Sequence, residues 1–136
     1  MVPNRIISVV EKTENGFSAF LEGVDGVVAA GKALDEVKKL LIEALEMHIE
    51  TSKELGELIP EILNGDYEII FQMDIPSLFE WLSGRISQTG LARIVGINNT
   101  LVHQYVTGVK KPGPKQRMKI EQNLHEFAYD LQKISF

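Results

Sequence analysis

Apolar and polar positions near the start of the chain form short runs typical of β-strands. Arg5 to Glu11 and Phe17 to Glu22 are rich in β-branched and aromatic residues. The Asn15-Gly16 pair between them favours a type I′ turn, so the sequence predicts a β-hairpin. A third strand is predicted at Val27 to Ala30, with Gly31 ending it.

Helical spacing follows this third run. Apolar residues recur at three- and four-residue steps and predict one long helix that lies across the hairpin: Leu34, Val37, Leu41, Ala44, Leu45 and a partly buried His48. Asp35 and Glu36 fall in its first turn, where carboxylates complement the helix dipole. Glu54 to Asp66 is expected to be a short helix and connector, with Pro60 at a possible helix start. In Tyr67 to Met73, apolar residues stand at every second position, which predicts a last strand.

The second half of the chain is patterned for helices throughout. Asp74-Ile75-Pro76 makes a plausible junction, because the residue before a proline is disfavoured in the α region. Apolar periodicity then predicts helices over Ile75 to Leu82 and Lys115 to Leu131. We therefore predict an α+β domain over residues 1–74 followed by an all-α domain over residues 75–136.

Residues 87–108 predict two short helices joined at Gly96, which can supply the positive φ of a tight turn. The segment resembles the helix-turn-helix of Xre and phage-repressor proteins. Gln88 opens the first helix, Ala92 and Gly96 set the turn, and Gly108 precedes the basic pair Lys110-Lys111. The resemblance extends from about Pro76 to about Phe127 and implies sequence-specific DNA binding.

Polar side chains of this motif are the candidate DNA contacts. Gln88 would meet a phosphate or a base, Asn98 would cap the recognition helix, and His103 is either a contact or an idle surface residue. Asn99, Thr100 and Gln104 would reach the major groove. The full predicted set is Ser87, Gln88, Asn98, Asn99, Thr100, His103, Gln104, Thr107, Lys110 and Lys111, the last three as phosphate contacts. The competing interpretation is a merely solvated helix face.

Charge separates along the chain. Residues 1–74 hold six Lys or Arg against fifteen Asp or Glu, a net charge of −9, whereas residues 75–136 hold eight against four, a net charge of +4. A basic binding module attached to an acidic one is therefore indicated, despite an overall charge of −5. The absence of cysteine excludes disulfides and Cys-ligated zinc, and three scattered histidines predict no metal site, so no cofactor is expected.

The first half resembles the HicB family of antitoxins. The residues that carry the resemblance are Asn15 to Phe20, Val24 to Val27, Gly31 and the helix containing Asp35 and Glu36. It implies a partial RNase H-like or double-stranded-RNA-binding-like fold. It also implies a type II toxin-antitoxin system, in which the chain neutralises a small basic HicA-like ribonuclease and represses its own operator.

Two departures from the family pattern bear mainly on toxin binding. Asp25-Gly26-Val27 stands where the family often has Pro-Gly-Cys, and Lys32-Ala33 stands where it often has an Asp-Thr helix cap. The lost cap should cost about 1 kcal/mol of helix stability. Phe20, Val24 and Asp25 are the predicted toxin contacts.

The same sequence features also bear on enzymatic activity, membrane insertion and self-association. Most acids of the first half lie along predicted helices rather than converging on a cleft, so we predict no catalytic residues and no enzyme. We expect a cytoplasmic protein without a membrane span. We also expect a homodimer or higher homo-oligomer with Lys115 to Phe136 as the candidate seam, although that stripe could equally close the domain core. A stand-alone regulator with a sensing or oligomerisation domain is the alternative. An RNA-binding module is opposed by the charge of −9.

Overall fold

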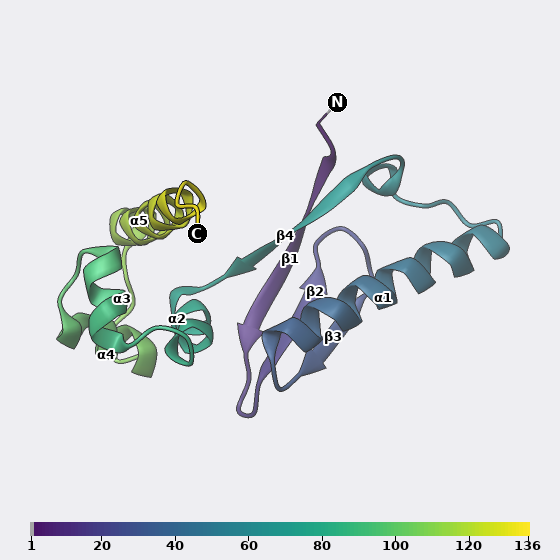
Figure 1. Cartoon of the computed structure of the whole chain (residues 1–136). Coiled ribbons are helices and arrows are strands. Elements are labelled where there is room, and N and C mark those ends of the chain that lie inside the picture. Colours follow the sequence, from purple (N-terminus) through teal and green to yellow (C-terminus); the bar gives the residue numbers. More distant parts are fainter. Residues whose placement is uncertain (1) are drawn as a thin grey trace. The chain divides into compact units, whose positions relative to one another are not determined.

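The computed structural model describes residues 2–136, which divide into two compact units with the break between Asp74 and Ile75 (Figure 1). Unit 1 ends at Asp74 and is a four-stranded sheet with one long helix. Unit 2 begins at Ile75 and is entirely helical. The α+β class predicted from the sequence is therefore confirmed.

The sheet of unit 1 has the strand order β3-β2-β1-β4. The strands are β1 (Asn4–Lys12), β2 (Phe17–Leu21), β3 (Val28–Gly31) and β4 (Tyr67–Met73). β1 pairs antiparallel with β2, and β2 with β3, whereas β4 pairs parallel with β1. A parallel partner needs a crossover connection, and the long helix between β3 and β4 supplies it.

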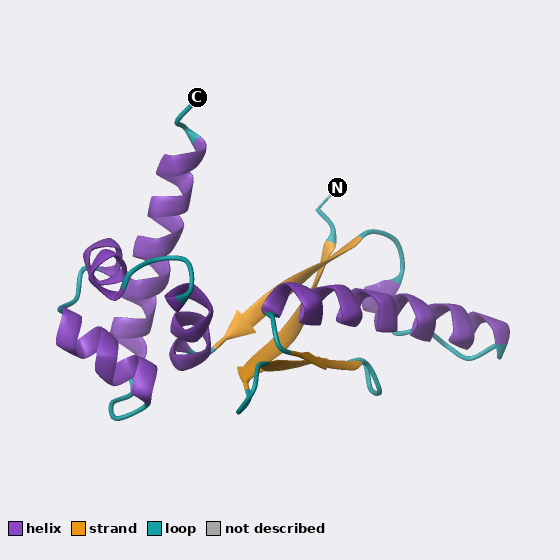
Figure 2. Ribbon diagram, turned by 60° about the horizontal axis from the view of Figure 1, so that its bottom comes forward, coloured by secondary structure: helices purple, strands orange, loops and turns teal. Residues whose placement is uncertain are grey.

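Helix α1 (Leu34–Glu54) lies across one face of the sheet and packs against β2 and β3 (Figures 1 and 2). Alternate strand residues meet its buried stripe, and the shared core includes Ile6, Val10, Ala19, Leu21, Val37, Leu41 and Leu45. Ala33 is the N-cap and its side chain makes no capping bond, as the missing Asp-Thr pair predicts. His48 is half-buried on this helix, as expected.

The hairpin turn differs from the sequence prediction. β1 and β2 are joined by the four residues 13–16, closed by a 2.7 Å hydrogen bond from Thr13 N to the Gly16 carbonyl. Neither Asn15 nor Gly16 has the positive φ that a type I′ turn needs, so that prediction is wrong. Gly16 is required for a different reason, because a Cβ there would lie 2.1 Å from the carbonyl oxygen of Gly31.

The connector from α1 to β4 contains a single 3₁₀ turn, η1 (Glu61–Leu63), directly after Pro60. The helix predicted for this region is thus reduced to three residues. The Asn4 side-chain amide donates to the carbonyl of Ile62 at 3.0 Å and fastens the connector to the start of β1.

Unit 2 has four helices, α2 (Ile75–Ser83), α3 (Gln88–Val95), α4 (Asn99–Thr107) and α5 (Pro114–Gln132). α2 packs on α4, and α3 packs on both α4 and α5. Their apolar faces enclose one core: Ile75, Phe79, Leu82, Leu91, Ala92, Val95, Val102, Tyr105 and Ile120. Within residues 2–136 no helix is both long and apolar enough to cross a membrane.

Candidate nucleic-acid interface

Helices α3 and α4 are joined by a tight turn that local side chains define. Gly96 has φ 74° and ends α3 in the left-handed region, as the sequence predicts. Ser87 caps α3 by accepting from Gly90 N at 3.0 Å, and Asn98 caps α4 by accepting from Leu101 N at 2.7 Å. The expected capping role of Asn98 is confirmed. Ser87 likewise acts as a cap, although it was predicted only as a DNA contact.

The end of α3 is also held from α5. The side-chain amide of Asn123 donates to the Val95 carbonyl at 2.8 Å, and Lys119 Nζ donates to the Gly96 carbonyl at 2.9 Å. Carbonyls in the last turn of a helix have no partner within the helix, so these bonds satisfy groups that would otherwise need water. Sequence reasoning missed both residues, because the pairs are separated by more than twenty positions.

Helix α4 presents a polar face opposite its buried one. Val102 and Tyr105 lie in the core of unit 2. Asn99, Thr100 and His103 are exposed, and the Gln104 side chain is half-buried. Polar groups at successive turns of one short exposed helix are arranged as a recognition helix in the major groove requires.

The first residues of α3 and α4 are hydrogen-bonded to each other. Gln88 Nε2 donates to the backbone carbonyl of Asn99 at 3.1 Å, and Asn99 Nδ2 donates to Thr89 Oγ1 at 2.9 Å. Each side-chain amide has two N–H groups and one carbonyl, so each keeps one N–H and its oxygen for another partner. Gln88 and Asn99 therefore lock the two helices together while both remain able to contact DNA.

Cationic side chains flank this polar face in the sequence. Lys110 and Lys111 are exposed in the loop after α4, and Lys115 and Arg117 are exposed in the first turns of α5. The Thr107 hydroxyl donates to the His103 carbonyl at 3.1 Å, within its own helix. As a hydroxyl it can still accept a hydrogen bond, but a phosphate oxygen would have to compete for its proton.

The C-terminal part of α5 extends the apolar stripe of unit 2 beyond its core. Ile120 is buried and Leu124 packs against the core. Further along the same stripe, Phe127, Leu131 and Ile134 are 44%, 50% and 58% exposed. The stripe therefore closes the core at its beginning and is exposed at its end, so its role as a dimer seam stays a prediction.

The predicted toxin contacts of unit 1 divide by burial. Phe20 is 45% exposed and Asp25 is exposed, so both are accessible to a partner. Val24 is only 2% exposed and packs in the core. Its side chain cannot contact a partner without opening the domain, and we drop it from the proposed contacts.

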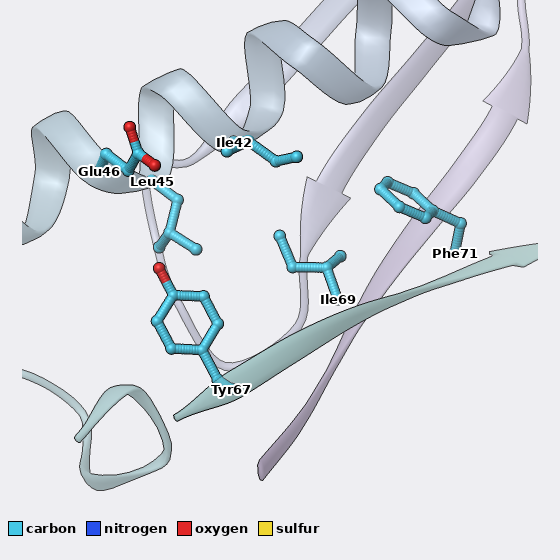
Figure 3. A pocket seen from close by; sticks show the side chains of 6 residues that line it. All are labelled: Ile42, Leu45, Glu46, Tyr67, Ile69 and Phe71. Carbon is cyan, nitrogen blue, oxygen red and sulfur yellow. The ribbon is translucent and has the colours of Figure 1, made fainter. Parts of the chain in front are cut away.

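A groove runs between α1 and β4 in unit 1. Its volume is about 370 Å³. Its lining residues are Ile42, Leu45 and Glu46 from α1 and Tyr67, Ile69 and Phe71 from β4. In Figure 3, Leu45 and Tyr67 point toward each other across the space between helix and strand, and the Glu46 carboxylate lies against the helix. The groove stays open because α1 packs mainly over β2 and β3. Its accessible lining is about equally polar and apolar, with one carboxylate and one phenol.

Residues 2–136 contain no cluster of three or more His, Asp or Glu side chains arranged to hold a metal ion. Comparison with known proteins adds no assignment, since no family model, curated protein or solved structure matches the chain. Function must therefore be argued from the two units and their surfaces.

Proposed function

We propose that unit 2 binds double-stranded operator DNA in a sequence-specific manner. The observation that carries this proposal is the locked α3–α4 pair, which leaves Asn99, Thr100 and His103 exposed on one short helix. Asn and Gln can pair with adenine in bidentate fashion, and Lys110 and Lys111 supply charge for the phosphates. The net charge of +4 in residues 75–136 supports the same partner.

The DNA complex is proposed to be dimeric. One short recognition helix contacts too few base pairs for strong specificity, whereas two copies read two half-sites about one helical turn apart. The open end of the α5 stripe, from Phe127 to Ile134, is the surface proposed to join them. Residues 124–136 carry Glu126, Asp130 and Lys133, so little net charge opposes self-association.

Unit 1 is proposed to neutralise a small basic HicA-like ribonuclease, which makes the whole chain an antitoxin and autorepressor. Support comes from the resemblance of the hairpin region to HicB antitoxins and from the net charge of −9 in residues 1–74. An anionic domain can cover the RNA-binding face of a basic toxin and repel RNA from it. The order of an acidic α+β unit and a helix-turn-helix unit agrees with many HicB proteins.

Selection from random double-stranded DNA with the purified full chain tests the DNA-binding proposal. We expect enrichment of a two-fold symmetric sequence whose half-sites are about 10 base pairs apart. Recovery of DNA without a common sequence would refute specific recognition, and no recovery at low salt would refute DNA binding altogether.

Growth of cells tests the antitoxin proposal. The short basic reading frame next to this gene is expressed alone and then together with the full chain. Arrest that is relieved by co-expression is the expected result. Absence of such a reading frame, absence of arrest, or arrest without rescue would each refute the antitoxin role.

The groove between α1 and β4 favours one second candidate, a stand-alone regulator that senses a small ligand. Its volume of about 370 Å³ lies in the range of small-molecule sites. Tyr67 and Glu46 would provide the polar contacts of such a ligand. Binding of a metabolite that changes the affinity for the selected DNA, in a chain that rescues no toxin, would favour this candidate.

A further inference from the structure

The sheet of unit 1 is covered on one face. α1 packs over β2 and β3, and the buried strand residues Ile6, Ser8 and Val10 point to that side. Side chains alternate along a strand, so Ile7 and Val9 point to the other side. Among the described elements of unit 1, no helix lies on this opposite face (Figure 2).

The strand register brings apolar side chains together on this uncovered face. Val28 pairs with Phe20, Phe20 with Val9, and Ile7 with Ile70. We call these five residues the open sheet face. Phe20 and Val28 are 45% and 65% exposed, and the other three are half-buried. Val28, Phe20 and Val9 form one row across β3, β2 and β1, which meets the polar Gln72 on β4, and Ile7 and Ile70 add an apolar pair beside it.

Acidic side chains surround the open sheet face. Glu11 is exposed on β1 beside Val9, Glu22 is exposed just after β2, and Glu68 is exposed on β4. Glu68 lies 3.4 Å from Arg5 in a cross-strand ion pair, which places both on this same side of the sheet. An apolar centre inside a charged rim is the usual anatomy of a protein interface.

We infer that the open sheet face is the docking site of a small basic protein, with Phe20 as its central anchor. This inference rests on the proposed antitoxin function for the identity of the partner as a toxin. Charge complementarity selects the class of partner, because the rim holds three glutamates against Arg5 and residues 1–74 carry a net charge of −9.

Other occupants fit this surface less well. A second copy would bring two acidic rims and two domains of charge −9 together, and like charges across an interface are unfavourable. RNA would meet the same repulsion through its phosphates. The groove between α1 and β4 is the rival position for a protein partner, and the test includes it.

Site-specific photo-crosslinking in the native host tests the docking site. The full chain carries p-benzoyl-phenylalanine in place of Phe20, of Ile42 in the groove, or of Leu58, which is 99% exposed in the connector. We expect position 20 to capture a small basic protein that the other two positions do not capture. Capture of a second copy or of nucleic acid at position 20, capture of a basic protein at position 42 alone, or no adduct would overturn the inference.

The captured protein is then purified and titrated with variants of the full chain. Phe20→Glu should weaken the complex about tenfold or more, because a charge enters the apolar centre. Leu58→Glu is the matched control and should change affinity by less than about twofold. Equal affinity for wild type and Phe20→Glu would refute the role of the open sheet face.

Failure of the function and failure of the site are distinguishable. A captured basic protein that needs Phe20 but does not arrest growth when expressed alone would refute the antitoxin role and leave the docking site in place. A toxin that the Phe20→Glu chain neutralises as well as the wild-type chain does would refute the docking site and leave the antitoxin role in place.

Discussion

Gly96 is the residue on which the geometry of the helix pair depends most directly. Its backbone φ of 74° is one that residues with a side chain rarely adopt. A Cβ at this position would also lie 3.3 Å from Asn123 Nδ2. Asn123 is itself needed at that position, because it donates to the Val95 carbonyl. Backbone strain and a tight contact therefore act together at one position.

We expect Gly96→Ala to lower the free energy of unfolding by about 1–2 kcal/mol, the cost of the left-handed region for an alanine. Denaturant unfolding of the full chain measures the change. Gly84→Ala is the matched control, because Gly84 has no positive φ and a Cβ there would meet no atom within 4 Å. Equal stability of the two variants would show that the turn at Gly96 relaxes freely.

Substitution of Gln104 and substitution of the basic pair Lys110-Lys111 should have different effects on DNA binding. Gln104→Ala is expected to relax the preference for one base pair by about 1–3 kcal/mol, because it removes a proposed base contact. Lys110→Ala and Lys111→Ala should weaken binding to all sequences and reduce its salt dependence, because they remove phosphate contacts.

Titration of the selected DNA and of single-base variants measures both effects. Exposed residues of α5 and its C-cap supply the controls, Gln122→Ala for the glutamine and Lys133→Ala for the lysines. A uniform loss on every sequence after Gln104→Ala would assign that side chain to the backbone of the DNA.

Sequence reasoning succeeded for local contacts and failed for distant ones. The cap at Asn98 and the left-handed Gly96 follow from neighbours in the chain. Lys119 is one of the eight Lys or Arg residues of the second half, and nothing in the sequence distinguishes it, yet its ammonium group is bonded to the Gly96 carbonyl. Val24 sits in a loop next to Asp25, and the pattern there does not reveal that tertiary packing buries it.

At the scale of elements, residue type and hydrophobic periodicity together predicted every strand and the five α-helices of the described chain. Loop chemistry was less informative. The Asn15-Gly16 pair favoured a two-residue turn, but the structure has a four-residue loop in which Gly16 lies close to the backbone of Gly31. The parallel pairing of β4 with β1 was also not predicted, because strand order depends on how the α1 crossover packs.

Helix α5 is the element whose role can be tested by one substitution. Leu131 is 50% exposed on the stripe that begins with the buried Ile120. We expect Leu131→Glu to convert the proposed dimer to a monomer without unfolding unit 2, because the residue lies outside the core. Two glutamates facing each other across the seam would repel.

Sedimentation at micromolar concentration measures this change. Met118→Glu is the matched control, since Met118 is 64% exposed on α5 but off the stripe. A wild-type chain that sediments as a monomer would refute the dimer, and a dimeric Leu131→Glu variant would place the seam elsewhere.

At the scale of the whole molecule, opposite charges are segregated into two units joined at the Asp74–Ile75 bond. Each unit is proposed to bind a partner of the opposite charge, so both complexes should weaken as salt is added. The DNA complex should lose affinity linearly in log salt, with a slope of about 0.9 for each phosphate contacted. The toxin complex should weaken less steeply, because the open sheet face contributes apolar contact that salt does not screen.

Titrations of each partner from about 50 to about 500 mM NaCl measure the two slopes, a range over which surface charges become strongly screened. An affinity that does not depend on salt would have a different meaning for each complex. A DNA affinity that ignores salt would contradict phosphate binding, whereas a toxin affinity that ignores salt would contradict only the electrostatic part of that proposal.

Helix α5 has a consequence for the DNA itself. One continuous helix carries Lys119 and Asn123, which hold the end of α3, and the exposed residues Phe127 and Leu131 of the stripe, whose last member Ile134 follows the helix. In the proposed dimer, the separation of the two recognition helices is therefore fixed by a rigid rod rather than by a flexible linker. The operator should tolerate base changes between its half-sites but not the insertion of a few base pairs there, which would rotate one half-site away from its helix.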